Sequence, residues 1–265
     1  MSLGAPVGRG LAAVVESGLP VSPCRLHRPR QMKRNWPLLT IFSIAYAFFI
    51  LAPAVFHQEF PLRDGMEWGD VLDIATPFVV LGFVWLLVRR TVGEVRGAAA
   101  LVLLLIAVIW SQGQGMHLVG NSIGHQFSED EGGAAFDLVH FYDEVLSHYI
   151  WSVAILAIPV YLLVIVSLAE TPAPAGFPFA ALPAAAVFGS IMGVDALESA
   201  VVPMALPAFV AIVALAACLA ATIPPLRGAE LFTFTAASAV VALGVLVGWG
   251  AYHGGWPEPS EVGLI

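Results

Sequence analysis

Two groups of polar residues at helical spacing interrupt a chain that is otherwise strongly apolar. The first group lies in GMHLVGNSIGHQF, residues 115–127 with the preceding Gln114, and the second lies in FDLVHFYDEVLSHYIW, residues 136–151. Both groups follow steps of three, four and four residues, which place their members on one face of a helix. The members are Gln114, His117, Asn121 and His125 in the first group and Asp137, His140, Glu144 and His148 in the second.

The imidazoles and carboxylates of these groups are side chains that bind transition metals. Neutral imidazole and carboxylate are ligands of Zn, Fe, Cu and Mn, and three histidines with one carboxylate suit a tetrahedral zinc site or an iron centre. We therefore predict a site for one or two ions of Zn, Fe or Cu. Its predicted ligands are His117, His125, His140, Glu144 and His148. Glu144 or Asp143 is the predicted catalytic base.

The spacing also predicts how the two groups meet. Only a short loop near SEDEGGAA separates them, so the two helices should be antiparallel neighbours. Residues at equal distance from the loop then lie at similar height, in three polar rungs about 6 Å apart. The predicted rungs are His117 with His148, Asn121 with Glu144, and His125 with His140. Gly120 and Gly124 form a small-xxx-small pattern that favours close approach of the helices.

Other polar residues have weaker claims to the site. Asn121, Asp195 and His253 are predicted as additional ligands, although His253, in WGAYHGGW, fits an interfacial aromatic belt equally well. Asp70 and Asp73 are expected to cap a helix N-terminus. A structural network of interhelical hydrogen bonds is the alternative to a metal site. Six matched polar positions inside a membrane bundle favour the functional interpretation, because such residues are costly there.

Composition places the chain among membrane proteins. Apolar residues make up 59% of its 265 residues, charged residues only 11%, and the mean hydropathy is +0.86. The net charge of −8 gives no support to nucleic-acid binding, which requires a basic surface. Cys24 and Cys218 lie far apart and form no CxxC motif or disulfide framework.

Apolar segments of about 20 residues predict an all-α, polytopic membrane bundle with seven spans. The predicted spans are 37–56, 71–90, 97–117, 145–168, 178–199, 205–223 and 231–252. Residues 1–35 are expected to be a disordered cytoplasmic tail, residues 36–254 the membrane domain, and residues 255–265 an extracytoplasmic tail. Met32 is an alternative start, and LAPA, residues 51–54, resembles a cleavage site. We expect the first helix to be retained, because its apolar run exceeds that of a usual signal peptide.

The distribution of basic residues predicts the orientation. Most of them precede the first span or lie in the loops after the second and sixth spans, while Arg63 is the exception. The loops on the opposite side are acidic. The positive-inside rule then predicts a cytoplasmic N-terminus and an external C-terminus in the plasma membrane. The predicted histidine site therefore faces outward.

The chain resembles the CREST group of seven-helix membrane hydrolases, which includes the alkaline ceramidases, in helix number and in its histidines. Those enzymes use Ser, Asp and three His around zinc, and Ser147, His148 and Asp143 are similar to part of that set. The late HxxxH pair of that group is absent, because His253 stands alone in the last span. The resemblance thus covers the architecture and implies a metal-dependent hydrolase by analogy.

Three functions remain open from the sequence. The first is a metal-dependent enzyme, a hydrolase or an oxidase, that acts on a lipid-like or other apolar substrate among the membrane lipids. The second is a metal-handling transporter, although the inner halves of the spans offer few polar groups for a pathway. The third is a non-catalytic membrane subunit with a structural polar network.

Overall fold

Apolar helices make up nearly all of the computed structural model, which describes residues 34–62, 66–124, 132–169 and 176–264. The described residues contain no β-strand, only one isolated antiparallel β-bridge between Glu59 and Glu67. The main helices are α1 (Trp36–Leu51), α2 (Trp68–Val92), α3 (Gly97–Gly124), α4 (Ala134–His140), α5 (His148–Leu168), α6 (Leu182–Glu198), α7 (Val202–Thr222) and α8 (Glu230–His253). Three short elements join them, namely the π-helix η2 (Phe141–Ser147) and the 3₁₀-helices η3 (Phe179–Ala181) and η4 (Pro224–Gly228). The predicted disordered tail falls almost wholly outside the described residues.

Six of these helical segments are long and apolar enough to cross a membrane. One of the six is the continuous run of α4, η2 and α5 over Ala134–Leu168. The helix α1 is apolar but has only 16 residues, because Pro53 follows its end and disfavours a further helical turn. The structure thus supports a polytopic membrane bundle, while the seventh span remains a prediction.

Two helices extend at least seven residues beyond their predicted spans, and both extensions carry polar residues. The third span was predicted to end at residue 117, but α3 continues to Gly124 and so includes Asn121. The fourth was predicted to begin at residue 145, but its helical run begins at Ala134. Hydropathy marks only the apolar part of a helix, so it does not detect turns that continue past the bilayer.

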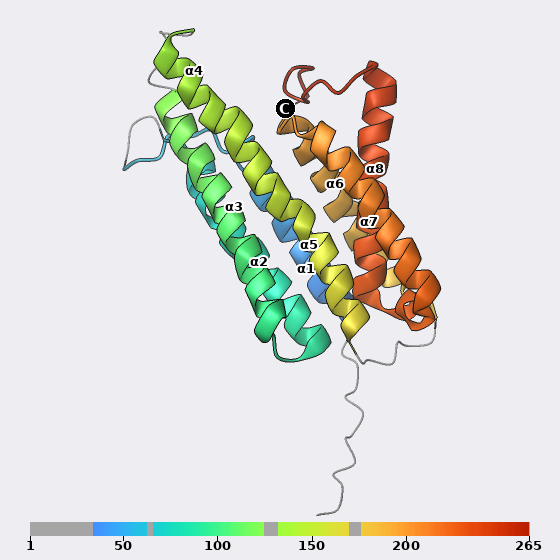
Figure 1. The fold of residues 1–265 in the computed structure, drawn as a ribbon. Coiled ribbons are helices and arrows are strands. Elements are labelled where there is room, and N and C mark those ends of the chain that lie inside the picture. The colour runs from blue at the N-terminus through green and yellow to red at the C-terminus, as the bar shows by residue number, and fades with distance from the viewer. Residues whose placement is uncertain (1–33, 63–65, 125–131, 170–175, 265) are drawn as a thin grey trace, which may run out of the picture. The chain divides into compact units, whose positions relative to one another are not determined.

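The helices α3 and α5 lie side by side, and α6, α7 and α8 lie on the other side of α5 (Figure 1). Glycines allow the closest approaches between helices. A Cβ atom on Gly189 of α6 would lie 2.3 Å from the carbonyl oxygen of Ser238 in α8, and one on Gly193 would lie 2.8 Å from Val245 Cβ. The α6–α8 pair therefore depends on a GxxxG face, as helices without a hydrophobic driving force between them require.

A cluster of aromatic rings fills the bundle between the middle of α1, the middle of α6 and the first turns of α8. Phe188 lies 4.9 Å from Phe42, 4.6 Å from Tyr46 and 5.5 Å from Phe234 between ring centroids, and all four side chains are buried. These three helices start at the same end of the bundle, beside the basic loops. Close-packed rings therefore fill the interior between that end and the middle of the bundle.

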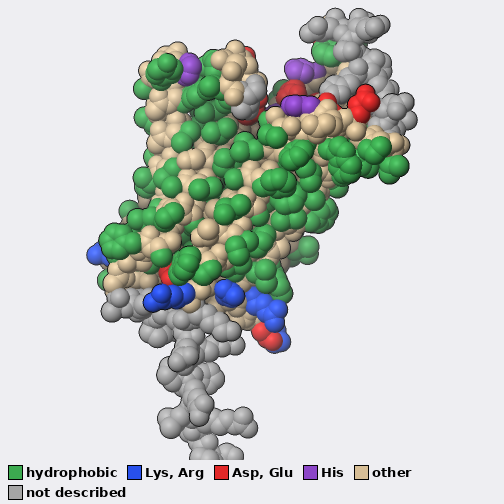
Figure 2. Space-filling model, turned by 180° about the vertical axis from the view of Figure 1, so that it is seen from behind, with side chains coloured by type: hydrophobic (Ala, Val, Ile, Leu, Met, Phe, Trp, Pro, Cys, Tyr) green, Lys and Arg blue, Asp and Glu red, His purple; other side chains and the backbone are tan. Residues whose placement is uncertain are grey.

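Charged side chains are segregated to the two ends of the bundle (Figure 2). Lysine and arginine lie at one end, most aspartate and glutamate and the histidines lie at the other, and hydrophobic side chains cover the band between them. The described cations are Arg34, Arg89, Arg90, Arg96 and Arg227. This segregation agrees with a chain that crosses a membrane in one orientation.

Candidate functional site

The site is built on the hairpin formed by α3 and the α4–η2–α5 run. Two glycines of α3 bring its arms together, because a Cβ on Gly113 would lie 2.6 Å from the backbone nitrogen of Trp151 and one on Gly120 would lie 2.7 Å from Asp143 Cβ. Gly124, which the sequence also suggested, has no contact closer than 3.8 Å. The two glycines that make close contacts, Gly113 and Gly120, are thus seven residues apart and lie on the same face of α3, two turns from each other.

The first predicted rung is present. The ring centroids of His117 and His148 lie 5.2 Å apart across the hairpin. The indole of Trp151 contacts both rings, at 4.9 Å from His117 and 4.8 Å from His148, and stacks on His148. The Trp151 Nε1 atom is buried without a hydrogen-bond partner among the described residues. The two imidazoles therefore share one aromatic wall.

The π-helix η2 changes which carboxylate faces His117. Asp143 and Ser147 are buried within η2, whereas the side chain of Glu144 is 46% exposed. The predicted face assumed α-helical steps, but a π-helical turn holds more residues and rotates the positions along it. Asp143 therefore takes the place beside α3 that regular spacing gave to Glu144. Such π segments often lie at functional sites.

His117 is paired with Asp143. Its Nδ1 lies 2.7 Å from Asp143 Oδ1, which is an ion-pair contact, although the two atoms are not aligned as a hydrogen bond and have no other partner in the described residues. A nitrogen lone pair and a carboxylate oxygen would repel each other at this distance, so Nδ1 carries the proton. The lone pair of the neutral ring then lies on Nε2, which is the arrangement of a metal-binding histidine held by a carboxylate.

His148 is oriented by a backbone carbonyl in the same way. Its Nδ1 lies 3.3 Å from the carbonyl oxygen of Ser199, which only a protonated Nδ1 can satisfy. Ser199 is the C-cap residue that follows α6, and the next residue, Ala200, has a φ of 52°, the left-handed conformation of a tight turn. The Nε2 atom of His148 is 3.8 Å from Glu144 Oε2. Both imidazoles thus keep Nε2 as the atom available for binding or proton transfer.

A second polar network links α3 to α2. Gln114 donates to Asp73 at 2.5 Å and accepts from Trp110 Nε1 at 3.1 Å, while Asn121 donates to Asp70 at 3.3 Å. Asp70 also closes a capping box at the start of α2, as expected, but Asp73 lies one turn inside and binds Gln114 instead. Asn121 therefore faces α2 and does not complete the predicted rung with Glu144.

The remaining candidates lie apart from this pair. His140 is exposed and stacks on Phe136, and His253 packs against Trp249 at 4.3 Å, as a belt residue would. Asp195 is half-buried and lines a small cavity that also includes Ser152. His125 lies outside the described residues, so its rung with His140 stays a prediction. Among the described side chains, no three His, Cys, Asp or Glu residues are grouped closely enough to hold a metal ion.

The segment after α8 folds back over the same end of the bundle. Trp256 donates to the carbonyl of Leu246, and the backbone nitrogen of Ser260 donates to Glu198 Oε2 at 3.1 Å. Burial raises the pKa of Glu258 in this segment, and the carboxylates of Glu261, Glu198 and Glu144 raise it further. The rim of the site is therefore rich in carboxylates.

Comparison with protein-family profiles, with curated proteins and with solved structures gave no match. The arrangement of the side chains and the apolar helices therefore carries the functional argument. The described part of the chain has the character of a helical membrane bundle, in which the rings of His117 and His148 lie side by side.

Proposed function

We propose that the protein is a metal-dependent enzyme that acts on a lipid-like substrate at the outer face of the plasma membrane. The observation that carries the proposal is the pair His117 and His148, each held through Nδ1 by an oxygen acceptor and each with Nε2 available. Imidazoles oriented in this way are typical of transition-metal sites. A bound Zn, Fe or Cu ion would supply Lewis acidity to water or to a substrate carbonyl.

The two carboxylates of η2 have different roles in this proposal. Asp143 is paired with His117 and is a positioning residue. Glu144 lies 3.8 Å from His148 and remains half-exposed, so it is free to act as the third ligand or as the general base. Since the described residues hold no group of three ligands, the ion needs Glu144 to turn inward or His125 to contribute.

A transporter is less consistent with the interior than an enzyme is. The buried hydroxyls of Ser43, Thr235 and Ser238 bond to carbonyls of their own helices, and close-packed aromatic rings lie beside them. Asn35 Oδ1 and the hydroxyl of Tyr46 are buried there without a hydrogen-bond partner among the described residues, but a continuous polar path to the basic end would need more such groups. The second candidate is a non-catalytic subunit, which the interhelical hydrogen bonds of Asp73 and Asn121 favour, because they join α2 to α3 without any ligand.

The metal content of the purified protein tests the proposal. We expect stoichiometric Zn, Fe or Cu, which His117→Ala and His148→Ala lower at least tenfold. The control is His57→Ala, since His57 lies on an exposed loop and its partners among the described residues are Glu67 and the carbonyl of Ala54. Glu144→Gln separates the two roles, because a general base leaves the metal in place and a ligand does not. Protein without stoichiometric metal under any growth condition would leave the structural network as the better explanation.

A further inference from the structure

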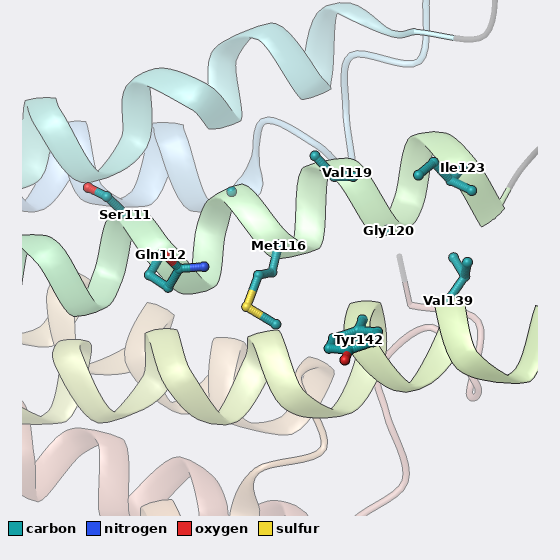
Figure 3. Close-up of a pocket in the computed structure, with 9 residues that line it drawn as sticks. Ser111, Gln112, Met116, Val119, Gly120, Ile123, Val139 and Tyr142 are labelled. Carbon is teal, nitrogen blue, oxygen red and sulfur yellow. The ribbon is translucent and has the colours of Figure 1, made fainter.

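The polar hairpin borders a groove and a smaller cavity, which differ in their polar groups. The groove has a volume of about 390 Å³ and lies between α3 and the opposite arm, where Met116 and Tyr142 border it (Figure 3). None of its lining residues carries a buried polar atom without a hydrogen-bond partner among the described residues. The smaller cavity, between α5, α6 and α7, is lined by such an atom, and this makes it the stronger candidate for a bound ligand.

The smaller cavity has room for one particle of the size of a water molecule, with a volume of about 10 Å³. Ser152 of α5 and Asp195 of α6 are its polar members. The apolar residues around them include Ile155, Met192, Val201 and Phe209. Ser152 lies one turn beyond His148, and Asp195 lies one turn before Ser199. The cavity is therefore one helical turn from the contact between His148 and Ser199.

The carboxylate of Asp195 has no compensating charge among the described residues. No described donor bonds to it, and the charged group within electrostatic range of it is a second carboxylate, Asp73. Asp73 accepts hydrogen bonds from Thr76 and Gln114, whereas the described arginines all lie at the other end of the bundle (Figure 2). A carboxylate among apolar helices is costly unless it is paired. Asp195 therefore requires a cation.

Hydroxyl oxygens near Asp195 are also without partners. Ser152 is only 3% exposed, and its Oγ atom has no hydrogen-bond partner among the described residues. The hydroxyl of Tyr46 is fully buried, has no described partner and lies within electrostatic range of Asp195. Other buried hydroxyls of the bundle, such as that of Ser238, bond to carbonyls of their own helices. The oxygen of Ser152 is thus left for a ligand in the cavity.

The two polar groups of the cavity select the kind of ligand. A water molecule would bond to Ser152 but would leave the charge of Asp195 without compensation. A proton would neutralise Asp195 but would give Ser152 no partner. A cation bound by both groups meets both needs, and oxygen ligands suit hard cations.

The size of the cavity and its single carboxylate favour sodium over other hard cations. Calcium takes six to eight oxygen ligands, and magnesium requires octahedral coordination that usually includes several waters. The cavity holds one particle and so has no room for such waters. Sodium is smaller than a water molecule, whereas potassium is about as large as one.

We propose that this cavity binds one sodium ion, held by the carboxylate of Asp195 and the hydroxyl of Ser152. The site is separate from the histidine pair, goes beyond the proposed function and stands whether or not that pair binds a transition metal. The ion joins α5 to α6 inside the bundle. Its binding therefore stabilises the folded protein.

The melting temperature of the purified protein in detergent tests the inference, with sodium chloride compared with choline chloride at equal ionic strength. A chelator of divalent ions is present, so that a metal at the histidine pair does not contribute. Sodium at several times its dissociation constant should raise the melting temperature by about 2–4 °C. Potassium should raise it less. Saturable binding of radioactive sodium, at one ion per chain, is the direct measurement and needs no variant.

Asp195→Asn should lose the sodium effect, because the amide keeps the shape of the side chain but removes its charge. Asp137→Asn is the matched control, since Asp137 is exposed on the hairpin, and it should keep the effect. Ser152→Ala should reduce the effect and carries the test if Asp195→Asn does not fold. Equal melting temperatures of the wild type in sodium and choline would overturn the proposal and leave a water molecule as the occupant. A full sodium effect in Asp195→Asn would also overturn it.

Discussion

Single side chains decide how the two central histidines are used. His117 and His148 come from different helices, yet both are held through Nδ1, one by Asp143 and the other by the carbonyl of Ser199. Each acceptor selects the same tautomer. The shared wall of Trp151 then leaves the two Nε2 atoms as the polar contacts that a ligand can use.

Replacement of the carboxylate beside His117 tests its positioning role. Asp143→Asn should lower metal affinity about 10- to 100-fold, because the amide orients the imidazole without raising its basicity. A titration with a competing chelator measures the change. Asp137→Asn is the control, since Asp137 is exposed on the same arm of the hairpin. If Asp143→Asn keeps full affinity while Glu144→Gln loses it, Glu144 is the carboxylate that matters.

Glu258 predicts a pH dependence in the segment after α8. Burial first, and then the neighbouring carboxylates, raise its pKa in the folded protein above the unfolded value of about 4.3. Its contribution to stability is therefore complete below that unfolded value and is lost as the pH rises through the folded pKa. Hydrogen exchange in residues 254–264 should become faster over that range. Glu258→Gln should flatten the profile, and an unchanged profile would exclude Glu258 as the cause.

At the scale of the helices, two features form the site: α3 packs closely against α5 and η2, and the π-helix η2 shifts the helical register. Gly113 and Gly120 let α3 contact α5 and η2 at backbone distance, and η2 turns Asp143 toward α3. Neither helix arm alone forms the pair of imidazoles. The geometry of the histidine pair therefore depends on the short distance between the two arms of the hairpin as much as on the identity of the two histidines.

A methyl group at the closest contact tests that dependence. Gly113→Ala should destabilise the protein by about 1–3 kcal/mol relative to Gly244→Ala, because its Cβ would lie 2.6 Å from the Trp151 backbone. Both variants gain the same helix propensity, so the difference between them isolates the packing cost. The free energy of unfolding in detergent measures it. Equal stability of the two variants would show that the arms separate at little cost.

The whole molecule is polarised along the direction of its helices. Described cations lie at one end, and the histidine pair and the carboxylate-rich rim lie at the other. The aromatic cluster of Phe42, Phe188 and Phe234 fills the interior between the basic end and the middle of the bundle. A ligand would therefore reach the histidines from the acidic end or from the lipid.

Reporter fusions test the orientation and the number of spans together. With a cytoplasmic basic end and seven spans, a reporter after Ile265 should be extracytoplasmic and one before Met1 cytoplasmic. α1 has 16 residues and a length of about 24 Å, so the bilayer must thin around it or its flanking residues must extend to the interface. Reporters on the same side of the membrane would show six spans and exclude α1.

The sequence alone determined the features that depend on a single segment of the chain or on two segments joined by a short loop. Seven apolar runs predicted helices whose ends agree closely at α6 and α8, because hydropathy is a property of each segment by itself. The His117–His148 rung was also predictable, since equal distance from a short loop sets the height of residues in a hairpin. The orientation, the metal and the reaction remain predictions that the variants above test.

Only the tertiary structure decided which polar residues face each other. A π-helical register is invisible to a count of α-helical steps, so Glu144 was placed where Asp143 lies. Asn121 and Gln114 share a predicted face with His117 but bind α2. The rotation of a helix about its axis is set by how all its neighbours pack, and apolar helices in lipid leave that rotation open until close contacts and interhelical hydrogen bonds choose it.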